Sequence, residues 1–487
     1  MKKAIVQFAS NSQHFAVTLE VMKDTEKSNI QYYYYLWGSN TKYPGRAATY
    51  FESLRKHPPK KYKRIIKKST NSVNYSSSLY FNRNWVKLTA SIFMDKIKVI
   101  NNLENLKDLN YLGIKPGPAL INEIATITKN IDFGVNSHEK LFKILIESYL
   151  QVYDATIKLV NDNQISSILI YNGRFFHEKA VWDAAKSKDI KVEIYETMRD
   201  RYVIQAEGFH NRINNQKIMI DHWNNSTMND QEKIEIGSRY YKELRSGLNP
   251  FKIDSSKTFE VKKPYFVYFS SSDDEYIGLG KDWEKKLGNQ IKCVEKLQEI
   301  FDKQERFELV IRLHPNLRNK SKEQKLAWGN VSNSKNSRII NEDTKISSYD
   351  LLDSAEGTIT FGSTMGLESA FAEKPCLTLA DCSYDLLSVV DKATNWKEVV
   401  EWINQGYQID SKEITLRKNN SCIRGFFLET AGEDFKYTKL RQTGYGSWQA
   451  LKFLDEEIYP DNYVRYYQRL ISKIKFLKIK WLIFNGR

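Results

Sequence analysis

The stretch TITFGSTMGLESAFAEKPCLTLA, residues 358–380, reads as an apolar strand, a turn of small residues, a helix and a second apolar strand. Gly362 lets the backbone approach a ligand closely, and Ser363 and Thr364 offer hydroxyl groups where the free N–H groups of the helix suit a phosphate. Glu368 lies one helical turn further on, where a carboxylate can accept hydrogen bonds from the two hydroxyls of a ribose. The alternative is a helix that is merely capped by a hydroxyl and stabilised by an acidic first turn.

A second polar group follows the strand VIRLHP, one βα unit earlier in the chain. This apolar run delivers Arg312 and then His314 before Pro315 ends it, so the imidazole is fixed at the end of the strand. A histidine there can donate a hydrogen bond to a phosphate and can polarise a leaving group near neutral pH. Ser271 and Ser272 follow the strand that begins with YFVYF in the same way. A histidine satisfied within the core is the alternative for His314.

Short apolar runs alternate with helical patterns along the chain, which is typical of βα units around a mostly parallel sheet. Ligands bind at the carboxyl ends of the strands in such sheets, so the polar residues above should converge on one rim. In the second half we expect strands at 265–272, 307–315, 358–363 and 375–380, with helices at 283–302, 321–328 and 365–373. In the first half we expect strands at 4–9, 30–38, 96–100, 166–172 and 190–196, with helices at 14–27, 139–163 and 176–187.

Polar residues also follow strands in the first half. Asn172 and Arg174 come at the end of one expected strand, and Arg174 suits a carboxylate or a phosphate. Both are candidate acceptor-binding residues, although an interdomain salt bridge is the alternative for Arg174. His14, at the start of the first helix, and Glu196, at the end of strand 190–196, are the two candidates for a catalytic base. The choice depends on which side chain reaches the acceptor hydroxyl.

The order of elements predicts an α/β protein with two Rossmann-like doubly wound domains facing a cleft, followed by C-terminal helices. The expected divisions are residues 1–255, 256–430 and 431–487. Residues 210–262 are polar, rich in asparagine and mostly helical by pattern, and we interpret them as a linker. The basic, aromatic tail at residues 463–487 predicts peripheral contact with an anionic membrane, with packing on the protein's own surface as the alternative.

The composition sets limits on partners and on the compartment. The chain has 487 residues and a formal net charge of +15, which favours anionic partners such as nucleic acid, anionic lipid or a phosphorylated small molecule. The four cysteines lack CxxC spacing, so we expect a reducing compartment and no zinc site. The first apolar run is too short for a signal peptide, and no run is long enough to span a membrane. These features predict a cytoplasmic protein.

The RLHP stretch, together with SSYDLLDSAEGTITFGSTMGLESAFAEKP, resembles the nucleotide-binding half of bacterial capsule and lipopolysaccharide glycosyltransferases of the GT-B fold. The resemblance is to the capsule polysaccharide biosynthesis type, which includes Kdo transferases. It is strongest over residues 265–385 and faint over residues 1–255. The chain is less similar to the CDP-glycerol glycerophosphotransferases of teichoic acid synthesis, which usually carry an Asp-Tyr-Ser-Ser type turn where this chain has Phe-Gly-Ser-Thr.

The resemblance implies that the C-terminal domain holds a nucleotide sugar and the N-terminal domain holds the acceptor. It places His314 at the donor phosphate, Ser363 and Thr364 at the phosphate or the sugar, and Glu368 at the ribose. Ser347 and Ser348 would lie beside the base. The full donor-binding set is Ser271, Ser272, Arg312, His314, Ser347, Ser348, Gly362, Ser363, Thr364 and Glu368.

These observations together predict a glycosyltransferase of the hexosyl or Kdo type, which moves a sugar from a CMP- or UDP-linked donor to a surface polysaccharide or a lipid-linked glycan. The chain has no DxD metal motif, so we expect a metal-independent reaction without a cofactor. The alternatives are a CDP-glycerol-type phosphotransferase of teichoic-acid-like polymers and, from another class, a basic protein that binds nucleic acid or lipid. The glycosyltransferase hypothesis predicts no nucleic-acid partner and a place at the inner face of the plasma membrane.

Overall fold

The protein is described by a computed structural model, in which the chain forms two compact units. Unit 1 contains residues 1–127, 133–210 and 432–487, and unit 2 contains residues 128–132 and 211–431. The described residues are 1–8, 12–26, 28–37, 63–67, 73–76, 78–100, 102–131, 133–134, 138–206, 212–246, 259, 261, 263–272, 286–444 and 447–458. The expected basic tail lies outside them.

Unit 1 is built on a seven-stranded sheet in the order β13-β6-β5-β4-β1-β2-β3. Its parallel part consists of β1 (Lys2–Gln7), β2 (Gln31–Leu36), β3 (Val73–Ser76), β4 (Ser167–Tyr171) and β5 (Lys191–Met198). Two antiparallel strands, β6 (Arg201–Ala206) and β13 (Glu433–Asp434), extend its edge. The order reverses between β1 and β4, so this is the point at which a doubly wound sheet binds ligands.

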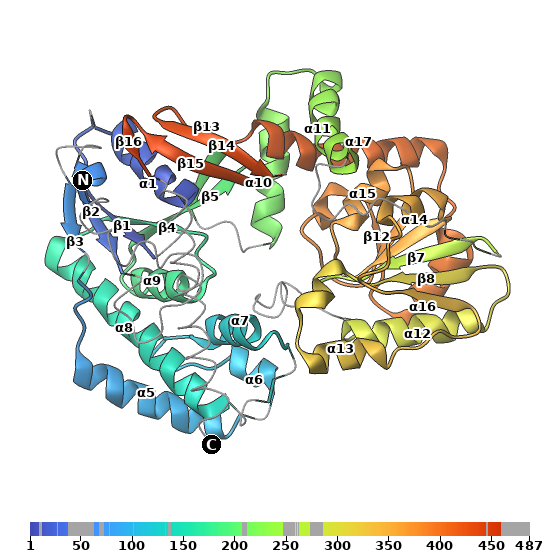
Figure 1. The fold of residues 1–487 in the computed structure, drawn as a ribbon, viewed down its shortest axis with the longest axis horizontal. Coiled ribbons are helices and arrows are strands. Elements are labelled where there is room, and N and C mark those ends of the chain that lie inside the picture. Colours follow the sequence, from blue (N-terminus) through green and yellow to red (C-terminus); the bar gives the residue numbers. More distant parts are fainter. Residues whose placement is uncertain are drawn as a thin grey trace. The chain divides into compact units, whose positions relative to one another are not determined.

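Helices cover the sheet of unit 1. They are α1 (Ser12–Asp24), α5 (Arg83–Lys98), α6 (Leu103–Lys107), α7 (Gly117–Thr128), α8 (Glu139–Asn163) and α9 (Phe176–Lys186). The long helix α8 packs against both α5 and α9 (Figure 1). On the other side, α1 packs against a small antiparallel sheet of β14 (Thr438–Gly444), β15 (Ser447–Phe453) and β16 (Glu456–Glu457).

Unit 2 contains a six-stranded, fully parallel sheet in the order β12-β11-β10-β7-β8-β9. Its strands are β7 (Tyr265–Phe269), β8 (Glu308–Arg312), β9 (Ser337–Ile340), β10 (Gly357–Thr360), β11 (Cys376–Thr378) and β12 (Asp391–Lys392). The chain starts in the middle with β7, builds outward through β8 and β9, and then returns to the other side of β7 with β10. The order therefore reverses between β7 and β10, as in a Rossmann sheet.

The apolar central strand of unit 2 supplies two separate cores. All five residues of β7 are buried, and alternate side chains point to opposite faces of the sheet. Phe266 and Tyr268 pack under α12 (Gln290–Asp302) and α16 (Trp396–Glu401), whereas Val267 packs with α14 (Ser348–Ser354) on the other face. α13 (Lys322–Gly329) and α15 (Met365–Phe371) follow β8 and β10.

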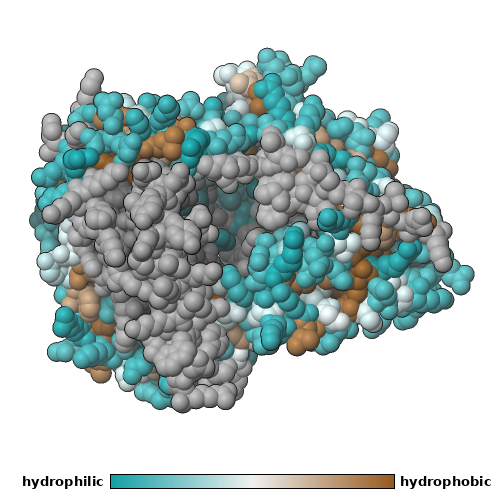
Figure 2. Space-filling model, in the orientation of Figure 1, coloured by the Kyte–Doolittle hydropathy of each residue, from teal (hydrophilic) through white to brown (hydrophobic). Residues whose placement is uncertain are grey.

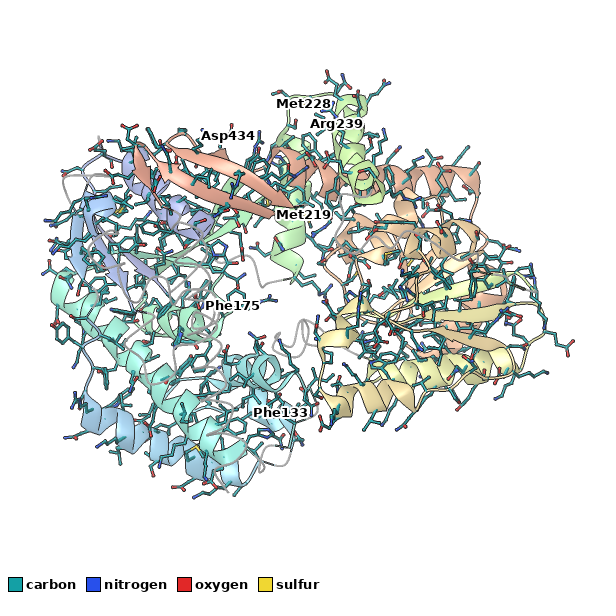
Figure 3. All side chains as sticks on the ribbon, viewed as in Figure 1. Phe133, Phe175, Met219, Met228, Arg239 and Asp434 are labelled. Atoms are coloured by element: carbon teal, nitrogen blue, oxygen red, sulfur yellow. The ribbon has the colours of Figure 1, made fainter. Side chains whose placement is uncertain are left out.

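The helical pattern expected in residues 210–262 is confirmed for α10 (Arg212–Asn225) and α11 (Asp230–Arg245). The interpretation of these helices as a linker is wrong, because they belong to unit 2. Both helices pack on α17 (Ser411–Thr430) within unit 2, and Met219 on α10 is buried (Figure 3). Gly237 allows α11 and α17 to approach closely. Any side chain at this position would clash, since a Cβ atom there would lie 2.2 Å from the carbonyl oxygen of Cys422. Their packing was not expected from the sequence, because α10 carries few apolar residues for its buried face.

Three other expectations need correction. Residues 96–100, expected as a strand, are mostly the last turn of α5, whose buried side chains recur at helical spacing up to Ile97. The segment after residue 431 is not helical in its described part, because β13 joins the sheet of unit 1 and β14 to β16 pack on α1. The expected boundaries at residues 255 and 430 therefore differ from the observed units. The α/β class with two Rossmann-like sheets is confirmed, whereas the cleft between them stays a prediction.

No helix within the described ranges is long and apolar enough to cross a membrane. Figure 2 shows a mostly hydrophilic described surface on the face it presents, with apolar residues in small groups. Membrane contact through the tail stays a prediction.

Candidate functional site

The serine run after β7 connects three strand ends at the carboxyl edge of the unit 2 sheet. The Ser270 hydroxyl accepts a hydrogen bond from the His314 N–H at 2.7 Å, which links β7 to the end of β8. The Ser271 hydroxyl donates to the Phe361 carbonyl at 2.8 Å, which links β7 to the end of β10 across the reversal point. Ser270, Ser271 and Ser272 are all buried. The expected convergence of these polar residues on one rim is therefore observed.

One glycine sets the conformation of the turn after β10, and hydrogen bonds with Thr378 and Tyr384 hold its backbone. Gly362 has a φ of +78°, a conformation that L side chains rarely adopt, and its N–H donates to the Thr378 hydroxyl. The Ser363 hydroxyl accepts from the Met365 N–H at 3.3 Å, and the Ser363 carbonyl accepts from the Tyr384 hydroxyl. Thr364 is exposed and its side chain makes no capping hydrogen bond. The capping alternative therefore fits Ser363, while the Thr364 hydroxyl faces solvent.

Glu368 lies one turn into α15 with a partly exposed side chain. Its Oε2 accepts a hydrogen bond from the Tyr349 hydroxyl at 2.7 Å. Burial of the carboxyl raises the pKa of Glu368 to about 7, although the Tyr349 hydroxyl and the Arg245 charge act in the opposite direction. This carboxyl group therefore changes its charge near neutral pH.

His314 caps the short helix η3 (Pro315–Asn319), and this contact defines its tautomer. Its Nδ1 accepts a hydrogen bond from the Asn316 N–H at 3.1 Å, so the neutral ring carries its proton on Nε2. The side chain is partly exposed. The ring is therefore oriented by its own helix start and presents an N–H donor, as an anion-binding histidine needs.

Three other residues of the predicted donor set lie near the segment between β9 and α14. Arg312 is buried, and its guanidinium donates to the carbonyls of Asn341 and Thr344; burial lowers its pKa to about 10. The Ser347 hydroxyl caps α14 by accepting from the Tyr349 N–H at 3.1 Å. Ser348 is the first residue of that helix and is partly exposed. A direct contact of Arg312, Ser347 or Ser348 with a donor stays a prediction.

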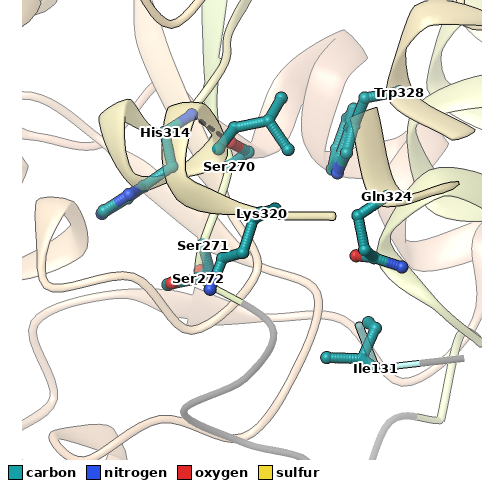
Figure 4. A pocket seen from close by; sticks show the side chains of 9 residues that line it. Ile131, Ser270, Ser271, Ser272, His314, Lys320, Gln324 and Trp328 are labelled. Atoms are coloured by element: carbon teal, nitrogen blue, oxygen red, sulfur yellow. Dashed lines mark hydrogen bonds between the residues drawn. The ribbon is translucent and has the colours of Figure 1, made fainter. Parts of the chain in front are cut away.

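A pocket of about 330 Å³, including adjoining solvent, opens beside the serine run (Figure 4). The pocket is lined by Ile131, Ser270, Ser271, Ser272, His314, Leu317, Lys320, Gln324 and Trp328. The far wall carries no sequence motif: Lys320 follows η3, Gln324 and Trp328 lie on α13, and Ile131 comes from a distant segment of the chain.

Unit 1 has its own polar cluster at the reversal point between β1 and β4. After β4 the backbone turns through Asn172 and Gly173, with φ values of +55° and +75°. The Asn172 side-chain amide donates to Glu196, and the Tyr171 hydroxyl also donates to that carboxylate. Burial raises the pKa of Glu196 to about 7, against the effect of these donors and of the Arg174 charge. The structure thus brings Asn172, Arg174 and Glu196 together.

Glu196 lies within β5, because this strand continues to Met198 and forms a hairpin with β6. Phe175 lies at the start of α9 (Figure 3). The guanidinium of Arg174 lies 5.4 Å from the centroid of the Phe175 ring. The expected strand end at Glu196 is therefore two residues too early. The position still lies near the carboxyl end of the strand, where a ligand-binding residue is expected.

His14 lies on α1, is buried, and stacks on Tyr171 with ring centroids 3.8 Å apart. Burial lowers the pKa of His14 to about 3, so the ring is neutral at physiological pH. His14 and Glu196 therefore both contact Tyr171, one through its ring and the other through its hydroxyl. The two base candidates belong to one cluster with different surroundings.

These features define a protein of two Rossmann-like α/β units, each with polar residues at the reversal point of its sheet. Residues 182–402 match the sequence model of the capsule polysaccharide biosynthesis protein family. The match includes all ten predicted donor-binding residues and confirms, over this range, the resemblance that the motifs predict. A comparison with curated proteins finds no significant match.

Among solved structures, the chain is similar to a β-Kdo 2,4 transferase, KpsC of Thermosulfurimonas dismutans. The two are 12% identical with a TM-score of 0.36, and the alignment covers 52% of this chain and 79% of the other. A UDP-GlcNAc 2-epimerase of Methanocaldococcus jannaschii, in complex with UDP-GlcNAc and UDP, is 13% identical with a TM-score of 0.31; the alignment covers 84% of this chain and 94% of that one.

Proposed function

We propose that the chain is a glycosyltransferase that moves a sugar from a nucleotide-sugar donor to a surface polysaccharide or lipid-linked glycan. The observation that carries the proposal is the reversal point of the unit 2 sheet. There the ends of β7, β8 and β10 bring together Ser271, His314 and the turn that begins at Gly362. The match to the capsule polysaccharide biosynthesis family over residues 182–402 supports the same conclusion.

In this proposal unit 2 binds the donor nucleotide, with CMP or UDP as the carrier. The Nε2–H of His314 and the exposed hydroxyl of Thr364 donate to the phosphates. The free oxygen of Glu368 accepts from the ribose. Gly362 lets the backbone of the turn approach the phosphate, because glycine has no side chain and readily adopts this positive φ.

Unit 1 then supplies the base, and the two candidates can be ranked by their surroundings. Glu196 has a pKa near neutral and is held by Asn172 and Tyr171, which suits a group that takes a proton from an acceptor hydroxyl. His14 is buried and stacked, and its lowered pKa makes it a weak base. We therefore assign the base role to Glu196 and a packing role to His14, with Asn172 and Arg174 beside the acceptor.

Calorimetric titration with CMP, UDP and GDP tests the donor site. We expect CMP or UDP to bind, and His314→Ala and Glu368→Ala each to weaken binding roughly tenfold, because each removes a hydrogen bond to a charged group. Glu356→Ala is the matched control, since Glu356 is exposed at the amino end of β10. Binding of duplex DNA but of no nucleotide would contradict the proposal and favour the basic nucleic-acid-binding alternative.

A further inference from the structure

Three helices of unit 2 meet at the side chain of Glu368. Tyr349, on α14, donates its hydroxyl to Glu368 Oε2 at 2.7 Å. Arg245, the last residue of α11, places its guanidinium 4.9 Å from the Tyr349 ring centroid. The same guanidinium pairs with Asp353, one turn further along α14, through hydrogen bonds of 3.0 Å. The Tyr349 ring is therefore held on its face by a cation that is itself fixed by a carboxylate.

In this arrangement one oxygen of the Glu368 carboxyl group accepts a hydrogen bond, and the other oxygen accepts none within the described part of the chain. Within the described part of the chain, Oε1 of Glu368 has no hydrogen-bond partner, whereas Oε2 is bound to Tyr349. The backbone of α15 is independently held, because the Ser369 hydroxyl donates to the Met365 carbonyl and accepts from Thr358. A carboxylate fixed through a single oxygen has a defined orientation and keeps its second oxygen for a ligand.

We infer that Tyr349 is a positioning residue of the donor site, which orients the Glu368 carboxylate toward the ribose while Arg245 and Asp353 fix the tyrosine ring. This inference rests on the proposed donor-binding role of Glu368. It gives α11 and α14 a supporting function, in which Tyr349 orients Glu368 and does not itself contact the donor.

The hydroxyl of Tyr349 also affects the pH range in which the Glu368 carboxyl group is ionised. It stabilises the ionised carboxylate, as does the Arg245 charge, so both lower the pKa of Glu368 against the effect of burial. The ionised carboxylate is the better acceptor for ribose hydroxyls. On the helices packed around Glu368, Tyr349 of α14 and Arg245 and Tyr241 of α11 interact electrostatically with its carboxyl group. Other charged or titratable groups on the packed elements include Asp350 and Asp353 of α14, Lys418 and Cys422 of α17 and Cys376 of β11.

The test is nucleotide binding by the full chain as a function of pH, with CMP and UDP as probes. Tyr349→Phe keeps the ring and removes the hydroxyl, so the pKa of Glu368 rises and the rise of affinity with pH moves to higher pH. We expect binding roughly fivefold to tenfold weaker near pH 6.5, and a smaller difference near pH 9. Arg245→Gln should move the profile in the same direction, because it removes a charge that favours the ionised carboxylate.

Tyr265→Phe is the matched control. Its hydroxyl donates to the Leu351 carbonyl of the same helix α14 at 2.9 Å and does not contact Glu368. The control should leave the pH profile unchanged. Equal profiles for Tyr349→Phe and the unaltered chain, with Glu368→Gln still impaired, would overturn this inference alone. An unaltered chain that binds neither CMP nor UDP at any pH would instead overturn the proposed function and this inference with it.

Discussion

One carboxyl group in each unit has a pKa raised to about 7, and the two groups differ in their partners. Glu196 receives hydrogen bonds from Asn172 and Tyr171, in a cluster that also contains His14. Glu368 receives one from Tyr349 and keeps an oxygen for a ligand. Burial is the main cause of both shifts. A proton acceptor and a ribose acceptor can thus arise from the same desolvation, because the neighbouring donors decide the role.

The raised pKa of Glu368 predicts a specific dependence of stability on pH. The folded-state pKa lies above the unfolded value of 4.5, so the folded state binds this proton more tightly. Its contribution is fully present at low pH and is lost as the pH rises from the unfolded value through about 7. Glu368→Gln removes this loss and can still accept from Tyr349. The melting temperature of the variant, relative to the original chain, should therefore rise between about pH 4.5 and about pH 8; a difference that is constant with pH would contradict the assignment.

The assignment of the base predicts different effects for the two candidates. Glu196→Gln should reduce sugar transfer about 100-fold or more while donor binding stays unchanged. His14→Gln should leave transfer within about tenfold, since it alters packing on Tyr171 but removes no base. In the original chain, the transfer rate should rise with pH through about 7, because the carboxylate must be ionised. Loss of transfer in the His14 variant alone would reverse the assignment.

At the scale of elements, the turn between β10 and α15 depends on a glycine that has no strained φ. A Cβ atom on Gly366 would lie 2.4 Å from the Tyr384 hydroxyl, which itself holds the Ser363 carbonyl. We expect Gly366→Ala to displace Tyr384, to destabilise the protein by about 1–3 kcal/mol and to weaken nucleotide binding.

Gly329→Ala is the matched control for this turn. Gly329 is also helical, and a Cβ atom there meets nothing within 4 Å. This change should be neutral or stabilise the protein by about 0.5–1 kcal/mol. Urea unfolding and titration with CMP or UDP measure both effects. Equal behaviour of the two alanine variants would show that Tyr384 does not shape the turn.

The elements that the sequence predicted well are those with strong apolar periodicity. Strands β1, β4, β7, β8 and β10 and helix α8 lie where the apolar runs indicated. The strand β9 was missed because it has only four residues, of which two are apolar. Its strand conformation is stabilised by the backbone pairing with β8, which the sequence pattern does not show. The helical pattern of α10 and α11 was visible, but their packing in unit 2 was not. α11 fits α17 through Gly237, and the buried Gln216 of α10 accepts a hydrogen bond from the Leu386 N–H; neither residue carries an apolar signal.

The candidate site was predictable where residues follow strands and unpredictable where they support other residues. His314, Glu368, Asn172 and Glu196 lie near strand ends that the pattern located. Tyr349 gave no signal, because its role depends on the contact between two helices that are separated in the chain by β10. Such contacts follow from tertiary packing and not from spacing along the sequence.

At the scale of the whole molecule, the chain leaves unit 1, forms unit 2 and returns to unit 1. The returning strands cover α1. Glu20 on α1 is fully buried, and its carboxylate accepts from the N–H groups of Lys436 and Tyr437 and from the Thr438 hydroxyl at 2.6 Å. The stability of the first unit therefore depends on residues from the end of the described chain.

This dependence can be tested with one buried side chain of the returning segment. Phe453 is 1% exposed and packs in the same core as α1. Phe453→Ala should cost about 3–5 kcal/mol and should speed hydrogen exchange of the α1 amides. Lys452→Ala, at the exposed neighbouring position, is the control. Unchanged exchange in α1 would mean that the two segments are not energetically coupled.

The central claim is that unit 2 binds the nucleotide at the reversal point of its sheet. Hydrogen exchange followed by mass spectrometry, with and without saturating CMP or UDP, locates the binding site directly. We predict slower exchange at residues 270–272, 314–317 and 361–368, and no change at residues 172–174 and 194–198. Protection confined to the unit 1 residues, or no protection at either site, would contradict the account.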